Sequence, residues 1–167
     1  MFSAGVITVS DGVYRGERSD ESGGEVRRCL SGAGDVVRYE VVPDEVELIA
    51  ATLRDWADGG DVDVILTTGG TGLSARDVTP EATLSVIDKA VPGLAEAMRS
   101  QTLAKTRLSM LSRAVAGVRK RCLIINLPGS PRAVRECLEV ILPVIPHAVG
   151  IITGEITVHT GRESGAH

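Results

Sequence analysis

The sequence predicts an α/β fold of three layers, in which a mostly parallel sheet is covered by helices on both faces. Four short, largely apolar runs rich in β-branched residues lie at 4–10, 36–42, 62–68 and 122–128. Such runs are typical of parallel strands that are buried on both faces. Segments with helical periodicity lie between them, and 43% of the residues are apolar. Strands and helices that alternate in this way favour an α/β architecture.

The predicted elements follow one another with clear boundaries, because Gly, Pro or Asp flanks each strand run. Two sets of apolar residues recur at helical spacing: Val46, Ile49, Ala50, Leu53 and Ala57, and then Val134, Cys137, Leu138, Ile141 and Ile145. Each set gives a helix one buried face. Pro143 and Pro146 should break the second helix, since proline lacks an amide hydrogen and crowds the preceding turn. Residues 114–118 are candidates for a short strand that forms a hairpin with 123–126.

We expect one domain over residues 1–154 and a mobile C-terminal tail over 155–167. A length of 167 residues is typical of a single domain, and we find no repeat and no low-complexity linker. The tail is polar and contains glycine, as in HTGRESGAH.

Composition argues against several classes of protein. The net charge of −4 and an aromatic content of 2% disfavour nucleic acid as a partner. No window of eighteen uninterrupted apolar residues exists, and the N-terminus lacks a basic region, so we expect a cytoplasmic protein that does not enter a membrane. Cys29, Cys122 and Cys137 show no C-x-x-C spacing, which favours small core residues over a disulfide framework or zinc site.

Three of the predicted strands end in loops of small and polar residues, at 11–12, 69–72 and 127–130. In an open parallel sheet, ligands bind outside the carboxyl ends of the strands, so these loops should face one crevice. Thr79-Pro80 and Ser130-Pro131 each predict a helix N-cap followed by proline at the first helical position. Free amides at helix starts favour an anion such as phosphate.

The Gly69–Gly72 stretch has several interpretations. Glycine permits positive φ angles and close approach of a ligand, which suits phosphate binding, but Gly-Gly-Thr-Gly can also be only a tight turn. No Lys-Ser or Lys-Thr follows, so the loop is not a Walker A motif. Gly70, Gly72 and Ala75 fit the dinucleotide pattern G-x-G-x-x-A, yet Pro80 places the helix start too late for that fold.

Two aspartates are candidate magnesium ligands. Asp77 follows the glycine loop, where a carboxylate beside phosphates suits a magnesium ion held by few protein ligands; alternatively it stabilises a helix N-terminus. Asp44 with Glu47 three residues later resembles a capping box, so it is either a helix cap or a metal ligand.

Other polar residues are weaker candidates. Ser10 and Asp11 are either a catalytic pair or a polar strand end, and Asn126 either lines a pocket or satisfies loop backbone groups. Ser112 has no histidine near it in sequence. A Ser-His-Asp hydrolase has little support, because G-x-S-x-G is absent and all three histidines come from residue 147 onward.

Five motifs then carry a family resemblance: VSDGVYRGERSDESG, VVPDE, TTGGTGLSARDVTPEAT, LSRAVAGVR and INLPGSPRAV. Over residues 5–154 the sequence closely resembles the MogA/MoaB proteins of molybdenum-cofactor biosynthesis and the G domain of gephyrin. The resemblance implies a molybdopterin-binding fold. For MogA-type members it implies transfer of AMP from Mg-ATP to the terminal phosphate of molybdopterin, with release of pyrophosphate.

The resemblance also implies roles for individual residues. Asp44 and Asp77 match the essential acids of the family, which hold Mg²⁺, and Ala75 stands where many relatives have proline. The remaining matches are the nucleotide-phosphate loop (Gly69, Gly70, Thr71 and Gly72) and other pocket positions (Ser10, Asp11, Ser112, Asn126, Pro128, Gly129 and Ser130).

Two further classes stay open beside this adenylyltransferase. A catalytically silent MoaB-like member would bind pterin or act as a scaffold, and it would bind nucleotide without turnover. A molybdate-inserting enzyme shares the domain but carries additional ones. The resemblance further implies ATP and molybdopterin as ligands, the molybdate-inserting enzyme as a partner, and a homo-oligomer, either trimer or hexamer. The apolar stretch at 142–152 would supply surface for such assembly.

Overall fold

A computed structural model describes residues 1–156 of the chain. Its elements follow the chain in this order: β1 (Phe2–Val9), α1 (Asp11–Tyr14), α2 (Glu21–Leu30), β2 (Gly34–Val42), α3 (Val46–Gly59), β3 (Val64–Thr68), α4 (Thr79–Leu84), β4 (Lys89–Ala90), α5 (Pro92–Thr102), the 3₁₀ helix η1 (Arg107–Leu111), β5 (Ala116–Arg119), β6 (Cys122–Leu127), α6 (Pro131–Ile141) and α7 (Ile145–Thr153). The four main strand runs and both periodic helices are confirmed. Most of the predicted tail lies outside the described residues.

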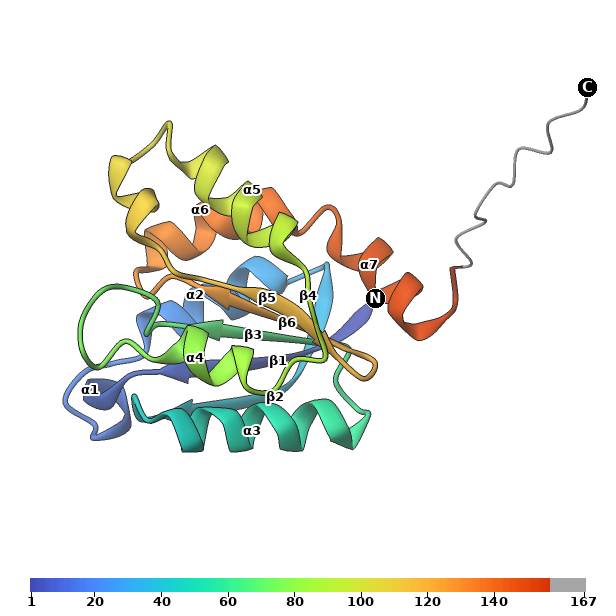
Figure 1. The fold of residues 1–167 in the computed structure, drawn as a ribbon, viewed down its shortest axis with the longest axis horizontal. Helices are drawn as coiled ribbons and strands as arrows, with labels where there is room; N and C mark the ends of the chain where they lie inside the picture. Colours follow the sequence, from blue (N-terminus) through green and yellow to red (C-terminus); the bar gives the residue numbers. More distant parts are fainter. Residues whose placement is uncertain (157–167) are drawn as a thin grey trace, which may run out of the picture.

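Within these residues the strands form one six-stranded sheet in the order β2-β1-β3-β6-β5-β4. Strands β2, β1, β3 and β6 are parallel, whereas β5 is antiparallel to both β6 and β4. The predicted hairpin is therefore confirmed, and its turn contains Lys120 with φ of 51°. In Figure 1 the parallel strands point to the left, where α1 and the β3–α4 loop (residues 69–78) project beyond the sheet.

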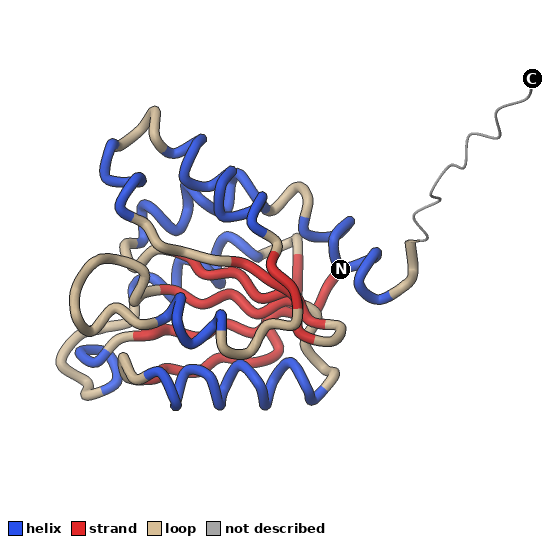
Figure 2. The backbone as a smooth tube through the Cα atoms, in the orientation of Figure 1, coloured by secondary structure: helices blue, strands red, loops and turns tan. Residues whose placement is uncertain are grey.

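Helices cover both faces of the sheet, which confirms the three-layer α/β prediction (Figure 2). On one face, α2, α5, α6 and α7 enclose a core that includes Leu66, Ile125 and Leu138. On the other face, α3 and α4 enclose a second core that includes Ile65 and Leu53. Strand β3 supplies side chains alternately to both cores, so both of its faces are buried; Val64, Ile65 and Leu66 are accordingly apolar, and Thr67 and Thr68 at its end are buried as well.

The chain bends by 62° between α6 and α7. Pro143 lies at this break and Pro146 lies in the first turn of α7, as predicted from proline chemistry. Over residues 1–156 we find no single helix that is long and apolar enough to cross a membrane, although α6 and α7 together satisfy those criteria. Ile145 and Val149 of α7 pack into the core, whereas Val144 and Ile151 are exposed.

Helix starts differ in part from the predictions. Ser130 caps α6, because its Oγ accepts a hydrogen bond from the Ala133 amide at 3.2 Å. The predicted cap at Thr79 is wrong: Val78 precedes α4, and Thr79 Oγ1 instead donates to the Gly69 carbonyl at 2.9 Å. Thr79 is fully buried, so its hydroxyl holds the glycine loop rather than the helix end.

Candidate active site

A polar cavity of about 590 Å³ lies at the carboxyl ends of the parallel strands. Ser10 follows β1, Asp44 follows β2, Gly69 and Gly70 follow β3, and Gly129 follows β6; all five line it. The start of α2 closes the cavity with residues 18–22. The strand-end loops thus face one crevice, as the parallel topology required.

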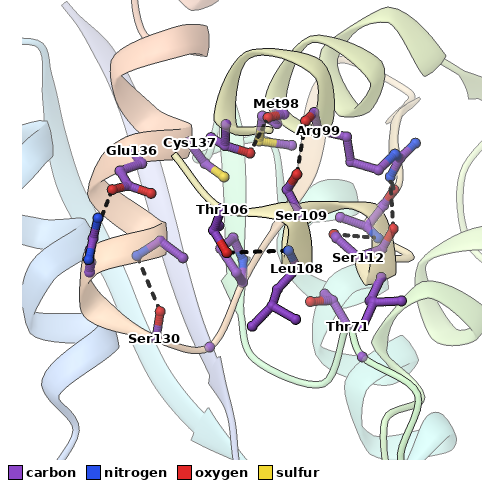
Figure 3. A pocket seen from close by; sticks show the side chains of 18 of the residues that line it. Thr71, Met98, Arg99, Thr106, Leu108, Ser109, Ser112, Ser130, Glu136 and Cys137 are labelled. Carbon is purple, nitrogen blue, oxygen red and sulfur yellow. Dashed lines mark hydrogen bonds and ion pairs between the residues drawn. The ribbon is translucent and has the colours of Figure 1, made fainter. Parts of the chain in front are cut away.

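A second, more apolar cavity of about 740 Å³ adjoins the first, between the β3–α4 loop, α5, η1 and α6 (Figure 3). Its apolar walls come from Leu73, Met98, Leu108, Leu111, Ala114 and Cys137. Gly70, Asp77 and Gly129 line both cavities. A ligand with a planar ring and a charged group could therefore extend from one cavity into the other.

The glycine loop has the backbone geometry that its sequence suggested. Gly69 and Gly70 have φ angles of 98° and 69°, in the region that favours glycine. A Cβ at Gly69 would lie 2.3 Å from the Val9 carbonyl oxygen, and one at Gly70 would lie 2.3 Å from Thr79 Oγ1. Neither position has room for a side chain, and both leave the backbone open to the polar cavity.

Asp44 and Asp11 hold each other in place across the ends of β1 and β2. The Asp11 amide donates to Asp44 Oδ2 at 2.8 Å, and the Asp44 amide donates to Asp11 Oδ1 at 3.0 Å. The helix-cap interpretation of Asp44 is therefore wrong: Glu45 precedes α3 and makes no side-chain cap bond. Chain reversal after β2 turns the Asp44 carboxylate back towards β1 instead.

The electrostatics of Asp44 indicate a site that would accept a cation. Burial raises the pKa of Asp44 above its usual value, and repulsion from the Asp11 and Asp77 carboxylates raises it further, although the Asp11 amide lowers it. Asp77 lines the same cavity, and its Oδ2 accepts from the Ser74 amide at 2.9 Å. A divalent cation between these two carboxylates would relieve the repulsion.

Two half-buried carboxylates also match the small number of protein ligands that Mg²⁺ uses beside phosphates. No cluster of three or more His, Cys, Asp or Glu residues with metal-binding geometry occurs in residues 1–156. The residues present therefore fit a magnesium ion shared with a substrate, and not a closed protein cage.

Two arginines near the loop do not reach either cavity. Arg76 pairs with Asp11, with Nη2 2.9 Å from Oδ2, and hydrogen bonds from the Asp44 amide and Arg76 lower the pKa of Asp11. Arg113 binds the loop backbone and Glu81. The cation that lines the polar cavity is Arg18, whose Nη2 donates to Ser10 Oγ at 3.2 Å.

The remaining predicted residues separate into two groups. Those that line a cavity are Ser10, Thr71, Gly72, Ser112, Pro128, Gly129 and Ser130. Asp11 lies behind the polar cavity and positions Asp44. Ser112 Oγ accepts from the Ala114 amide at 3.3 Å, and no histidine lines either cavity among the described residues, so nothing there activates it as a nucleophile.

Asn126, predicted as a pocket residue, does not line either cavity. The side chain is fully buried, with Nδ2 donating to Thr67 Oγ1 at 3.0 Å and to Thr83 Oγ1 at 2.9 Å. Its Oδ1 accepts from the Val115 amide at 3.2 Å. Asn126 thus joins β6 to β3, α4 and the segment before β5. The bond from the Val115 amide corresponds to the alternative role given above, in which Asn126 satisfies a loop backbone group.

Sequence reasoning missed the residues that come from α5 and from the segment that leads into α2. Arg18 and Asp20 line the polar cavity from that segment, and Met98 and Arg99 line the apolar one from α5. The only local sequence signal for any of these residues was the segment ERSDESG. In this segment Asp20 caps α2, because its carboxylate accepts from the Gly23 amide at 2.9 Å. Both helices reach the site only through packing against the sheet.

The chain is similar to proteins of one known family. Residues 5–147 match the family model described as a probable molybdopterin binding domain. The molybdopterin adenylyltransferase of Helicobacter pylori strain J99 is 43% identical over 153 residues, which cover 90% of this chain and 87% of the relative. Gephyrin of Dictyostelium discoideum is 42% identical over 162 residues, covering 90% of this chain and 22% of that protein.

A solved structure shows the same fold. The molybdopterin biosynthesis enzyme MoaB of Thermus thermophilus superimposes with a TM-score of 0.88 and 55% sequence identity, over 92% of this chain and 98% of that one. The family model covers most of the chain, and this structure covers nearly all of the described residues. The chain therefore belongs to the family of molybdopterin-binding domains that includes the MogA and MoaB proteins.

Proposed function

We propose that the chain is a molybdopterin adenylyltransferase of molybdenum-cofactor biosynthesis. In this reaction an oxygen of the terminal phosphate of molybdopterin attacks the α-phosphorus of ATP. A new phosphorus–oxygen bond forms, the bond between the α-phosphorus and the bridging oxygen to the β-phosphate breaks, and pyrophosphate leaves. The similarity to relatives named molybdopterin adenylyltransferase supports this assignment.

One observation in the structure carries the proposal. Two half-buried carboxylates, Asp44 and Asp77, face a polar cavity whose floor is the bare backbone of Gly69 and Gly70. Phosphates need a backbone that they can approach closely, and two acids beside them need a counter-cation. The adjoining apolar cavity has the volume for a ring system of either substrate.

Asp44 and Asp77 would hold Mg²⁺. The ion would neutralise charge on the phosphates and lower the repulsion between the two anionic reactants. The chain itself supplies positioning: Asp11 orients Asp44, and Thr79 holds the Gly69 carbonyl, which fixes the glycine loop beside the cavity. Arg18, which lines this cavity, offers a fixed positive charge to a phosphate.

No protein nucleophile is needed, because the phosphate of one substrate attacks the other directly. The unactivated state of Ser112 is consistent with this mechanism. We assign Ser112, like Pro128 and Ser130, to contacts with the substrates. Most of the rate enhancement would come from alignment of the two phosphates and from electrostatic stabilisation of the transition state.

We further propose that residues 1–154 act as one domain and assemble into a homo-oligomer, a trimer or hexamer, in the cytoplasm. Val144 and Ile151 are 49% and 41% exposed at the α6–α7 bend, where a second copy could cover them. Light scattering at micromolar concentration should give at least three times the monomer mass. A monomer in that measurement would contradict the assembly.

The decisive experiment incubates the protein with molybdopterin, ATP and Mg²⁺ and detects adenylylated pterin and pyrophosphate. We expect formation of both products in equal amounts, and none when Mg²⁺ is chelated. Calorimetric titration with ATP runs in parallel. Nucleotide binding without product would favour a catalytically silent member that binds pterin or acts as a scaffold.

A further inference from the structure

The Arg113 side chain lies across the base of the β3–α4 loop. Its Nε donates to the Gly72 carbonyl at 2.8 Å, and its Nη2 donates to the Asp77 carbonyl at 2.7 Å. The Arg113 amide also donates to the Thr71 carbonyl at 2.9 Å. One residue therefore ties down both ends of segment 72–77, which carries the Asp77 carboxylate.

Arg113 is itself held from two sides. Its guanidinium forms an ion pair with Glu81 of α4, which raises the pKa of Arg113 and lowers that of Glu81. Arg99 of α5 donates from Nη1 to the carbonyls of Ser112 and Ala114, at 3.3 and 2.8 Å. These carbonyls flank Arg113, so α5 fixes its backbone while α4 fixes its side chain.

Segment 72–77 has few other polar contacts with the rest of the described chain. The bonds between Ser74 and Asp77 are internal, with the Ser74 amide 2.9 Å from Asp77 Oδ2 and the Asp77 amide 3.0 Å from the Ser74 carbonyl. They hold the shape of the turn but not its position. Arg76 also reaches from the segment to Asp11, with Nε and Nη2 each donating at 3.0 Å, but its side chain is 59% exposed, so solvent screening weakens this ion pair.

We propose that Arg113 is a positioning residue that sets where the Asp77 carboxylate lies in the two cavities. It does not line either cavity, so it acts through the loop and not on the substrate. Lysine cannot replace it, because an ammonium group lacks the planar fork that reaches two carbonyls and a carboxylate at once. The kinetic consequence rests on the proposed adenylyl transfer, whereas the position of the loop can be measured without substrate.

Arg119 provides a matched control at the opposite end of the sheet. It binds the Val86 carbonyl from Nη1 at 2.9 Å and Asp58 from Nε and Nη2 at 2.9 and 2.8 Å. Arg119→Lys therefore removes the same type of fork, which joins a carbonyl and a carboxylate, without touching either cavity. If removal of such a fork has a general effect on the protein, that effect appears in both variants.

The first measurement is hydrogen exchange of the ligand-free protein in peptides that cover residues 69–78. In Arg113→Lys the released segment should open locally more often, so we expect the Ser74 and Asp77 amides, whose bonds are internal to it, to exchange at least about tenfold faster. Arg119→Lys should match the wild type in this peptide. Unchanged loop exchange in Arg113→Lys would overturn the proposal.

The second measurement is the Mg²⁺ concentration that half-saturates adenylyl transfer. It should rise by about tenfold or more in Arg113→Lys and stay at the wild-type value in Arg119→Lys. Faster loop exchange with unchanged Mg²⁺ dependence would also refute the role. If Arg113→Lys does not fold, Glu81→Gln tests the same anchor with a smaller expected shift. Absence of transfer by the wild type would instead refute the proposed function, and hydrogen exchange would still decide whether Arg113 positions the loop.

Discussion

Replacing Asp44 with asparagine should abolish most of the activity while leaving the protein folded. The asparagine side chain keeps an oxygen that can accept the Asp11 amide, now 2.8 Å from Oδ2. Exchange of a charged acceptor for a neutral one costs about 1 kcal/mol. Removal of a carboxylate that is partly buried and repelled by Asp11 and Asp77 offsets this cost. We therefore expect a free energy of unfolding within about 1 kcal/mol of the wild type.

The effect on transfer should be much larger. Charge neutralisation by a metal at phosphate contributes several kcal/mol to transition-state stabilisation. Loss of about 3–4 kcal/mol corresponds to roughly 10²–10³ in rate, because each 1.36 kcal/mol is tenfold. Single-turnover adenylyl transfer across a Mg²⁺ titration measures this quantity, and denaturant unfolding of the same samples measures stability.

Asp63→Asn is the control for this substitution. Asp63 is also half-buried and accepts from the Ser3 amide at 2.8 Å, but it precedes β3, at the end of the strands opposite to the polar cavity. Its variant should keep transfer within about twofold of the wild type, since it lines neither cavity. If Asp44→Asn also retained transfer within a few-fold, the metal-site reasoning would be refuted.

The pH dependence of stability gives an independent check on Asp44. Its pKa is raised above 3.8 in the folded state, so the native protein binds this proton more tightly than the unfolded chain does. The contribution of Asp44 to stability therefore falls as pH rises from the unfolded pKa through the folded one, and then stays constant. Relative to the wild type, Asp44→Asn should gain stability across that window. A difference independent of pH would contradict the raised pKa.

Three further outcomes follow from local packing. Gly70→Ala should lower the free energy of unfolding by about 2–4 kcal/mol in denaturant titration, because φ is 69° and the new Cβ would lie 2.3 Å from Thr79 Oγ1. Wild-type stability of this variant would contradict the turn geometry. Asn126→Ala should cost about 2–4 kcal/mol in the same assay, since it leaves the part-buried Val115 amide and two buried hydroxyls without their partner. A cost below about 1 kcal/mol would count against this network. Burial raises the pKa of Cys122 to about 12, so a thiol reagent at about pH 8 should label it only after unfolding, and rapid labelling of the native protein would contradict its burial.

Much of the fold was predictable because burial on two faces leaves a local signal. Strand β3 begins with three apolar residues because both of its faces are buried, and α3 has to present Ile49, Leu53 and Ala57 at helical spacing. Helix α2 lacked such a signal: it contains two consecutive glycines and buries only Gly23, Val26 and Leu30. Its stability comes from packing against β1 and α6, which no local pattern reports.

The candidate site was predictable to the level of loops but not of side-chain direction. Glycine at 69 and 70 indicated positive φ angles, and both residues have them. Thr79 was predicted to be a cap, and Asp44 either a cap or a metal ligand, yet both side chains turn towards a neighbouring strand end. A hydroxyl or carboxylate between a strand and the following helix can bond either to the backbone of the helix start or to the backbone of a neighbouring strand end. The bond that forms depends on which of these two partners the fold brings closer.

By itself, the sequence determined the alternation of strands and helices, the glycine loop after β3 and the motifs that assign the chain to its family. These features depend on residues within a few positions of one another, so periodicity and turn chemistry suffice to predict them. Only the tertiary structure decided that Asn126 supports the core, that Asp11 orients Asp44 and that Arg113 holds the loop of Asp77. Each of these contacts joins residues from 33 to 59 positions apart in the chain. Parallel crossovers bring such residues together, and a hydrogen bond forms only where the packed sheet and helices fix both partners at the correct distance.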